Sequence, residues 1–134
     1  MHEDSKEHRR QRKKRSTRKM DDKEAKKFYK SAKWIHKREQ ILRRDHYECQ
    51  ICRQRITSAE EDGRELPAQD RRIRRAVIVH HIRHLKDFPE LALDDDNLIS
   101  VCHECHDRLH ERDTETLNAY RRLTKPKAIT EEKW

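Results

Sequence analysis

Two cysteine pairs with the same two-residue spacer constrain the fold of this chain more than any other feature. They are Cys49 with Cys52 and Cys102 with Cys105, and the 134 residues contain no further cysteine. Four thiolates in such pairs are typical ligands of a structural zinc ion, whose binding contributes folding free energy directly. The N-terminus is polar and basic, without the apolar stretch of an export signal, so we expect a four-cysteine zinc site and not two disulfides.

The composition supports a metal-stabilised fold with a polyanionic partner. Hydrophobic residues make up 31% of the chain and charged residues 45%, so the apolar core is expected to be small. The net charge is +8, from 34 Lys and Arg against 26 Asp and Glu. Such an excess favours nucleic acid as the partner, because each cation near a phosphate releases a condensed counterion. No segment is apolar enough to predict a membrane partner.

The sequence divides into a basic tail over residues 1–22, one domain over 23–125 and a C-terminal tail over 126–134. Residues 9–15 are a dense cationic run, which we expect to be disordered in isolation. Two functions remain open for it: an arm that follows a nucleic-acid backbone, or a solubilising or localisation tail.

The domain is expected to be of the α+β class. Apolar spacing predicts one helix over 23–44, in which Phe28 and Trp34 are packing residues. Residues 53–75 are charged and predicted to be mostly loop. Strands are predicted over 76–80 and 97–101 as an antiparallel hairpin with a long connection, followed by a helix from His103 to about Lys125 that Pro126 ends.

Three histidines are candidates for a second metal site. His80 lies at the end of the first predicted strand, and His106 and His110 occupy positions i and i+4 of the following helix, about 6 Å apart. Three protein ligands leave positions open for water and a phosphate oxygen, as in a catalytic site. A single zinc finger built from two cysteines and two histidines is not expected, because the gap from Cys52 to His106 far exceeds the roughly dozen residues that such a finger uses.

His81 is the candidate general base. It follows His80 directly, and a bend at the strand end would bring its imidazole near the metal without coordinating it. Its unperturbed pKa lies near neutrality, which suits proton transfer from a water that attacks phosphorus. The amide of Asn97 is expected to hold the long loop and to orient this base through a backbone carbonyl.

These residues resemble the HNH endonucleases, particularly the small zinc-containing type found in phage genomes beside DNA-packaging genes. The resemblance covers about residues 28–110 and rests on four motifs in order: Cys49-x2-Cys52, Val79-His80-His81-Ile82, Asp96-Asn97-Leu98-Ile99 and Cys102-x2-Cys105-His106.

The resemblance implies a ββα-metal fold with a preceding N-terminal helix, and hydrolysis of DNA phosphodiesters to 5′-phosphate and 3′-hydroxyl ends. It implies that His81 is the general base, that Asn97 matches the family's asparagine and that His106 binds the catalytic metal. His80 stands where the family often has Asp, and His110 is a third ligand as in the colicin-type nucleases. The catalytic ion is then Mn²⁺, Ni²⁺, Zn²⁺ or Mg²⁺, and imidazole ligands favour the first three.

Two other functions and two other metal ligands remain open beside this hypothesis. The main alternative is a non-catalytic zinc module that binds DNA or protein, and a ribonuclease is a third possibility. His84 and His103 are competing candidates for the second metal. As a phage-encoded nuclease, the protein is expected in the bacterial cytoplasm, with DNA and phage terminase or other packaging proteins as partners.

Overall fold

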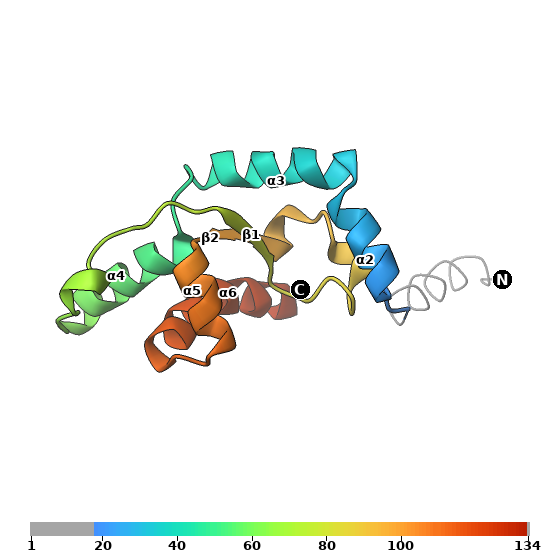
Figure 1. Cartoon of the computed structure of the whole chain (residues 1–134). Coiled ribbons are helices and arrows are strands. Elements are labelled where there is room, and N and C mark those ends of the chain that lie inside the picture. The colour runs from blue at the N-terminus through green and yellow to red at the C-terminus, as the bar shows by residue number, and fades with distance from the viewer. Residues whose placement is uncertain (1–17, 134) are drawn as a thin grey trace. The chain divides into compact units, whose positions relative to one another are not determined.

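The computed structural model describes the backbone of residues 18–133 and side chains as far as residue 124 (Figure 1). The cationic run at residues 9–15 lies outside the described residues. Helices and strands follow in the order α2 (Asp22–Tyr29), α3 (Ala32–Arg44), α4 (Gln50–Asp62), β1 (Ile78–His81), β2 (Leu98–Val101), α5 (His103–His110) and α6 (Thr114–Lys133). No helix among these residues is long and apolar enough to cross a membrane.

The described chain forms two compact units. The first comprises residues 18–39 and 81–98, and the second comprises residues 40–80 and 99–133. One boundary falls inside α3, between Glu39 and Gln40, and the other two fall inside the strands, between His80 and His81 and between Leu98 and Ile99. Whether residues 23–125 act as one domain stays a prediction.

In the first unit, the helix predicted over 23–44 is interrupted. Asp21 begins α2 with a capping box to Glu24, and α2 ends at Tyr29. The hydroxyl of Ser31 accepts a hydrogen bond from the Trp34 amide at 3.2 Å and so caps the first turn of α3. The apolar spacing continues past Ser31 and so predicted one helix, whereas this serine competes with the helical backbone and starts a new helix.

A small apolar cluster supports the long connection between the strands. Ala25 of α2 packs with Leu85 and Ala92 of that connection, and Met20 and Phe28 lie against them. Trp34 is also buried, which confirms that it is a packing residue.

In the second unit, α4 replaces residues 53–62 of the loop predicted over 53–75. It begins at the first cysteine pair and ends at Gly63, which adopts φ 68° in the left-handed region where glycine is favoured. Ile51, Arg55 and Ala59 lie on its buried face. The prediction was wrong for residues 53–62 because an arginine occupies a core position, which breaks the apolar period of this helix.

The predicted antiparallel hairpin is confirmed. The Val77 amide donates to the Val101 carbonyl and the Ile82 amide to the Asn97 carbonyl, so the residue numbers run in opposite directions along the pair. In the second unit the carboxylate of Asp45 accepts a hydrogen bond from the Ser100 amide at 3.1 Å. The buried Asp45 thereby anchors β2 to the end of α3.

The single helix predicted from His103 to Lys125 is two helices. Arg112 adopts φ 59°, and Asp113 caps the start of α6 by accepting a hydrogen bond from the Thr116 amide at 3.0 Å. Pro126 does not end α6, which continues to Lys133 and loses one backbone hydrogen bond at the proline.

Candidate metal centres and active site

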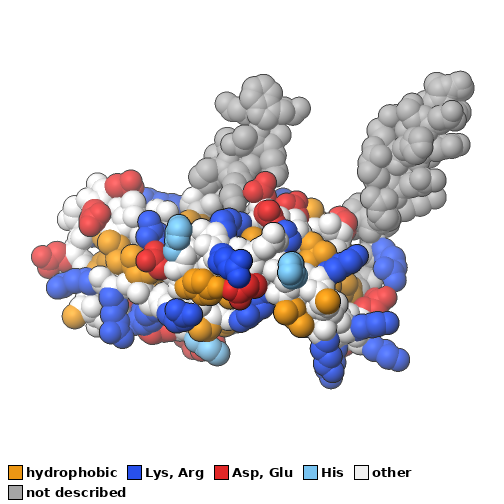
Figure 2. Space-filling view, turned by 90° about the horizontal axis from the view of Figure 1, so that it is seen from above, with side chains coloured by type: hydrophobic (Ala, Val, Ile, Leu, Met, Phe, Trp, Pro, Cys, Tyr) orange, Lys and Arg blue, Asp and Glu red, His pale blue; other side chains and the backbone are white. Residues whose placement is uncertain are grey.

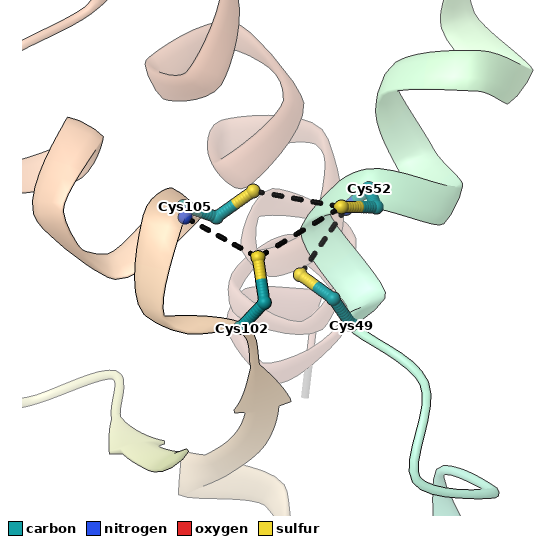
Figure 3. A group of neighbouring side chains, drawn as sticks. All are labelled: Cys49, Cys52, Cys102 and Cys105. Atoms are coloured by element: carbon teal, nitrogen blue, oxygen red, sulfur yellow. Dashed lines mark hydrogen bonds between the residues drawn. The ribbon is translucent and has the colours of Figure 1, made fainter. Parts of the chain in front are cut away.

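The four cysteines converge in the second unit. Their sulfur atoms lie within 4.8 Å of one another and all four side chains are buried (Figure 3). The Cys52 sulfur is 4.0 Å from that of Cys102 and 3.7 Å from that of Cys105. Four sulfurs around a tetrahedral zinc ion with bonds of about 2.3 Å are separated by about 3.8 Å, so the cluster fits zinc. None of these cysteines forms a disulfide.

Each pair reaches the cluster by the same local geometry. Cys49 is the N-cap of α4, and its sulfur accepts a hydrogen bond from the Cys52 amide at 3.4 Å. Cys102 is the N-cap of α5, and its sulfur accepts from the Cys105 amide at 3.3 Å. The amides and the positive end of each helix dipole stabilise thiolate charge.

Mutual crowding prevents these thiols from ionising independently. Hydrogen bonds from neighbouring sulfurs, with burial added, raise the pKa of Cys49 and Cys105 above the usual value. The same sharing of protons lowers the pKa of Cys102 to about 7. Full ionisation therefore needs a cation at the centre, as the chemistry of a zinc tetrathiolate supplies.

Three imidazoles form a chain of ring contacts in the same unit. The ring centroids of His80 and His106 lie 5.5 Å apart, and those of His106 and His110 lie 4.8 Å apart. A metal bound about 2.0–2.1 Å from ring nitrogens lies about 3.2 Å from each centroid, so two rings that share it have centroids about 5–6 Å apart. The structure therefore brings together the three histidines that the sequence singled out.

This second group is less convergent than the sulfur cluster. Across residues 18–124, the cysteines alone bring three or more potential ligand atoms within 4.8 Å of one another. Burial and the neighbouring His110 lower the pKa of His106 and so favour its neutral, ligating form. Metal binding by His80, His106 and His110 consequently requires rotation of their side chains.

Tyr120 is a further member of this group, and the sequence motifs did not identify it. Its hydroxyl oxygen lies 3.1 Å from Nε2 of His80, and the two rings meet edge to face with centroids 5.5 Å apart. Burial raises the pKa of Tyr120 to about 12, so the hydroxyl is neutral at physiological pH.

In the first unit, His81 lies among aromatic rings. The Trp34 ring stacks on its imidazole with centroids 5.0 Å apart and an interplanar angle of 24°, and Phe28 and Tyr29 approach at 6.2 and 6.3 Å. His81 is only 7% exposed, and this burial lowers its pKa. The spacing of Phe28 and Trp34 predicted packing, but it could not identify a histidine as what they pack against.

The two ring nitrogens of His81 have different roles. Nε2 lies 3.1 Å from the carbonyl oxygen of Ala92. A carbonyl can only accept a hydrogen bond, so Nε2 carries the proton and Nδ1 has the lone pair of the neutral imidazole. Any proton accepted by His81 therefore goes to Nδ1.

Asn97 holds the long connection closed. Its side-chain oxygen accepts a hydrogen bond from the Arg83 amide at 2.8 Å, while its amide nitrogen donates to the carbonyls of Arg83 and Leu91. The next carbonyl after that of Leu91 belongs to Ala92, the partner of His81. Asn97 thus fixes the segment that orients the His81 ring.

Other features of the surface do not coincide with these groups. A cavity of about 540 Å³ lies between α4 and α6, and its lining of mostly charged side chains contains none of the predicted site residues. Lys and Arg side chains are spread over the visible face and interspersed with Asp and Glu (Figure 2). That face displays no single basic patch.

The segment that contains these residues matches a known protein family. Residues 49–112 match the model of the HNH endonuclease family, and this range includes every predicted ligand together with His81 and Asn97. A crystal structure of the HNH endonuclease of the deep-sea thermophilic bacteriophage GVE2 with manganese ion is similar at a TM-score of 0.48 and 29% identity. That match covers 84% of this chain and 95% of the other. A search of the curated proteins found no match.

Proposed function

Because the chain carries an HNH endonuclease domain over residues 49–112, we propose that it is a metal-dependent endonuclease that hydrolyses DNA phosphodiester bonds. The observation that carries this proposal is the contact of His80, His106 and His110 within the matched segment. Three neutral imidazoles leave room in a metal's coordination sphere for water and a phosphate oxygen.

Two metal ions have separate roles in this proposal. Zinc binds Cys49, Cys52, Cys102 and Cys105 and stabilises the second unit. A second divalent cation, Mn²⁺, Ni²⁺, Zn²⁺ or Mg²⁺, binds His80, His106 and His110. When bound, it supplies Lewis-acid stabilisation of charge on the phosphate and on the departing oxygen.

The contact between Tyr120 and His80 supports one choice of ligating atom. In this proposal Nδ1 of His80 would hold the metal, while Nε2 keeps its proton and donates to the Tyr120 hydroxyl. Ligating histidines commonly use their second nitrogen in this way, because the hydrogen bond fixes the ring orientation. Tyr120 is then a positioning residue.

His81 is the proposed general base, with Nδ1 as the accepting atom. The Ala92 carbonyl holds the proton on Nε2, so His81 is poised to take a proton from the attacking water. Burial, which lowers its pKa, keeps the imidazole neutral and able to accept. Asn97 supports this orientation through the connection, and the expected products carry 5′-phosphate and 3′-hydroxyl ends.

The proposal extends to the substrate, the protein partner and the cellular location. We propose that residues 23–125 act as one nuclease domain on DNA, to which the excess of Lys and Arg is suited. A contribution to phage DNA packaging, with terminase as a partner and the bacterial cytoplasm as the location, extends the proposal.

One observation favours a non-catalytic alternative. His81 is 7% exposed and its Nε2 is already bonded, as for a histidine that only packs. A zinc-stabilised module that binds DNA or protein would keep this arrangement and need no accessible base.

A plasmid-nicking assay tests the two functions. Zinc-loaded wild-type protein with Mn²⁺ or Ni²⁺ is expected to convert supercoiled plasmid to nicked or linear DNA. His81→Ala is expected to lower the rate by about 10²–10⁴, the contribution typical of general-base catalysis. His36→Ala is the matched control, because it removes an exposed imidazole from α3 of the same unit. Cutting at the wild-type rate by His81→Ala would refute the assigned base.

Failure of the wild-type protein to cut DNA with any of these cations would instead favour the binding module. A parallel assay on single-stranded and structured RNA separates a ribonuclease from a DNA endonuclease.

A further inference from the structure

Arg55 is the most deeply buried charged residue of the second unit. It projects from α4, is only 1% exposed, and has no carboxylate hydrogen-bond partner among the described residues, although the charges of Asp70 and Asp113 lie near enough to interact with it. Its Nη2 atom donates to the Cys105 sulfur at 3.2 Å and to the Thr116 hydroxyl at 3.0 Å. Its Nε and Nη1 atoms are buried without a hydrogen-bond partner. A guanidinium in this position needs a nearby negative charge.

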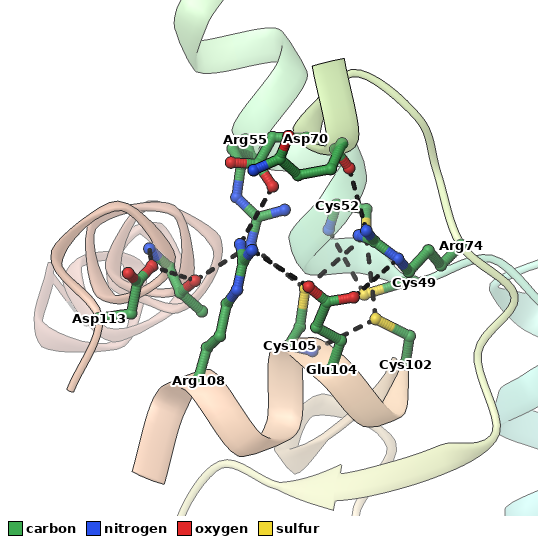
Figure 4. A network of polar contacts seen from close by, with 12 residues as sticks. Cys49, Cys52, Arg55, Asp70, Arg74, Cys102, Glu104, Cys105, Arg108 and Asp113 are labelled. Carbon is green, nitrogen blue, oxygen red and sulfur yellow. Dashed lines mark hydrogen bonds and ion pairs between the residues drawn. The ribbon is translucent and has the colours of Figure 1, made fainter. Parts of the chain in front are cut away.

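The sulfur cluster can supply that charge. Four thiolates around Zn²⁺ carry a net charge of about −2, and they lie in the same buried interior as Arg55. The other arginines beside the cluster have carboxylate partners: Arg74 pairs with Glu104 at 3.0 Å, and Arg108 pairs with both Asp70 and Glu104 at 3.1 Å (Figure 4). Arg55 therefore differs from these arginines in that its direct partners include a cysteine sulfur and no described carboxylate.

A relay of hydrogen bonds holds Arg55 in this orientation. The Thr116 hydroxyl that accepts from Arg55 donates in turn to the Asp113 carboxylate at 2.7 Å. Asp113 and Thr116 belong to the start of α6, whereas Cys105 belongs to α5. The guanidinium is thus fixed between three helices and aimed at a cysteine of the sulfur cluster.

We propose that Arg55 is the built-in counter-ion of the zinc site, retaining the metal by neutralising thiolate charge and by donating to Cys105. This inference rests on the zinc site proposed above. It assigns a role to a buried arginine that the HNH chemistry does not use. Loss of such an outer partner typically weakens metal binding about 10- to 100-fold.

The test measures zinc retention and not cleavage. Zinc-loaded protein is mixed with a chromogenic chelator at fixed neutral pH, and the rate of zinc transfer is followed. Arg55→Met, which keeps the length of the side chain but removes its charge, is expected to release zinc about 10- to 100-fold faster than wild type. Arg53→Met is the control, because it removes an exposed arginine two residues away on the same helix.

Arg55→Lys separates the effect of the positive charge from the effect of side-chain volume. It also replaces Arg55→Met in the test if that variant does not fold. A lysine keeps the positive charge, so its release rate is expected to lie between those of wild type and Arg55→Met. Zinc release by Arg55→Met at the rate of Arg53→Met overturns the inference, as does release by Arg55→Lys as fast as by Arg55→Met. Wild-type protein that purifies and refolds without zinc would refute the zinc site itself.

Discussion

Replacing Tyr120 by phenylalanine tests how the second metal site is built. The substitution keeps the ring that lies edge to face with His80 and removes only the hydroxyl 3.1 Å from Nε2. If Nδ1 of His80 binds the metal, the variant loses the hydrogen bond that holds the ligand in place. Metal affinity should then fall while the fold and the zinc site stay intact.

The size of the effect follows from the type of bond. A neutral hydrogen bond of this kind contributes about 0.5–1.5 kcal/mol net. That range corresponds to a rise of about 2- to 12-fold in the dissociation constant for Mn²⁺. The upper part of the range is expected, because His80 and Tyr120 are both partly shielded from water and the lost acceptor leaves a ring N–H without its partner.

Isothermal titration calorimetry of Mn²⁺ into zinc-loaded protein measures this difference. Tyr29→Phe is the control, since it removes a tyrosine hydroxyl from α2 in the first unit, whereas the proposed ligands belong to the second unit. Unchanged or tighter Mn²⁺ binding by Tyr120→Phe would refute the reasoning. Tighter binding would mean that the metal takes Nε2 and displaces the hydroxyl.

Three further predictions concern the surroundings of the two sites. Stripping zinc with a strong chelator should abolish the cooperative thermal transition of the second unit, as measured by circular dichroism. Adding Zn²⁺ should restore the transition and adding Mn²⁺ should not, because thiolates prefer the softer ion. Trp34→Leu should lower the nicking rate without changing the Mn²⁺ dissociation constant. Trp34→Phe keeps a ring against His81 and should retain most of the wild-type nicking rate. Asp113→Ala should lower the free energy of unfolding by about 1 kcal/mol in urea titrations at neutral pH, as expected for loss of a helix N-cap, and a stability equal to wild type would contradict the cap.

Local patterns in the sequence predicted the parts of the site that local geometry determines. The two-residue spacer in each cysteine pair suffices to place one thiol at a helix N-cap and the other on its first turn. The four-residue step from His106 to His110 likewise puts two imidazoles on one helix face, and their centroids lie 4.8 Å apart. The β-branched run before His80 predicted the strand, whose observed start lies two residues later.

Helix boundaries were harder to predict because single polar side chains set them. Ser31 and Asp113 each cap a helix where the apolar spacing continues without interruption, so the pattern predicted one helix instead of two at both places. The charged segment that contains α4 has too few apolar residues for a periodic signal, and its buried face includes a cation.

Arg55 shows why the remaining part of the site is not readable from the sequence. Along the chain it is one of 34 Lys and Arg, 50 residues away from the cysteine that it contacts. Its burial is understandable once four thiolates and the proposed ion are placed beside it, since a guanidinium is excluded from a protein interior unless negative charge accompanies it. The arginine that obscured the pattern of α4 is therefore also the proposed outer partner of the zinc site, and a single buried cation accounts both for the error in predicting α4 and for the missed partner.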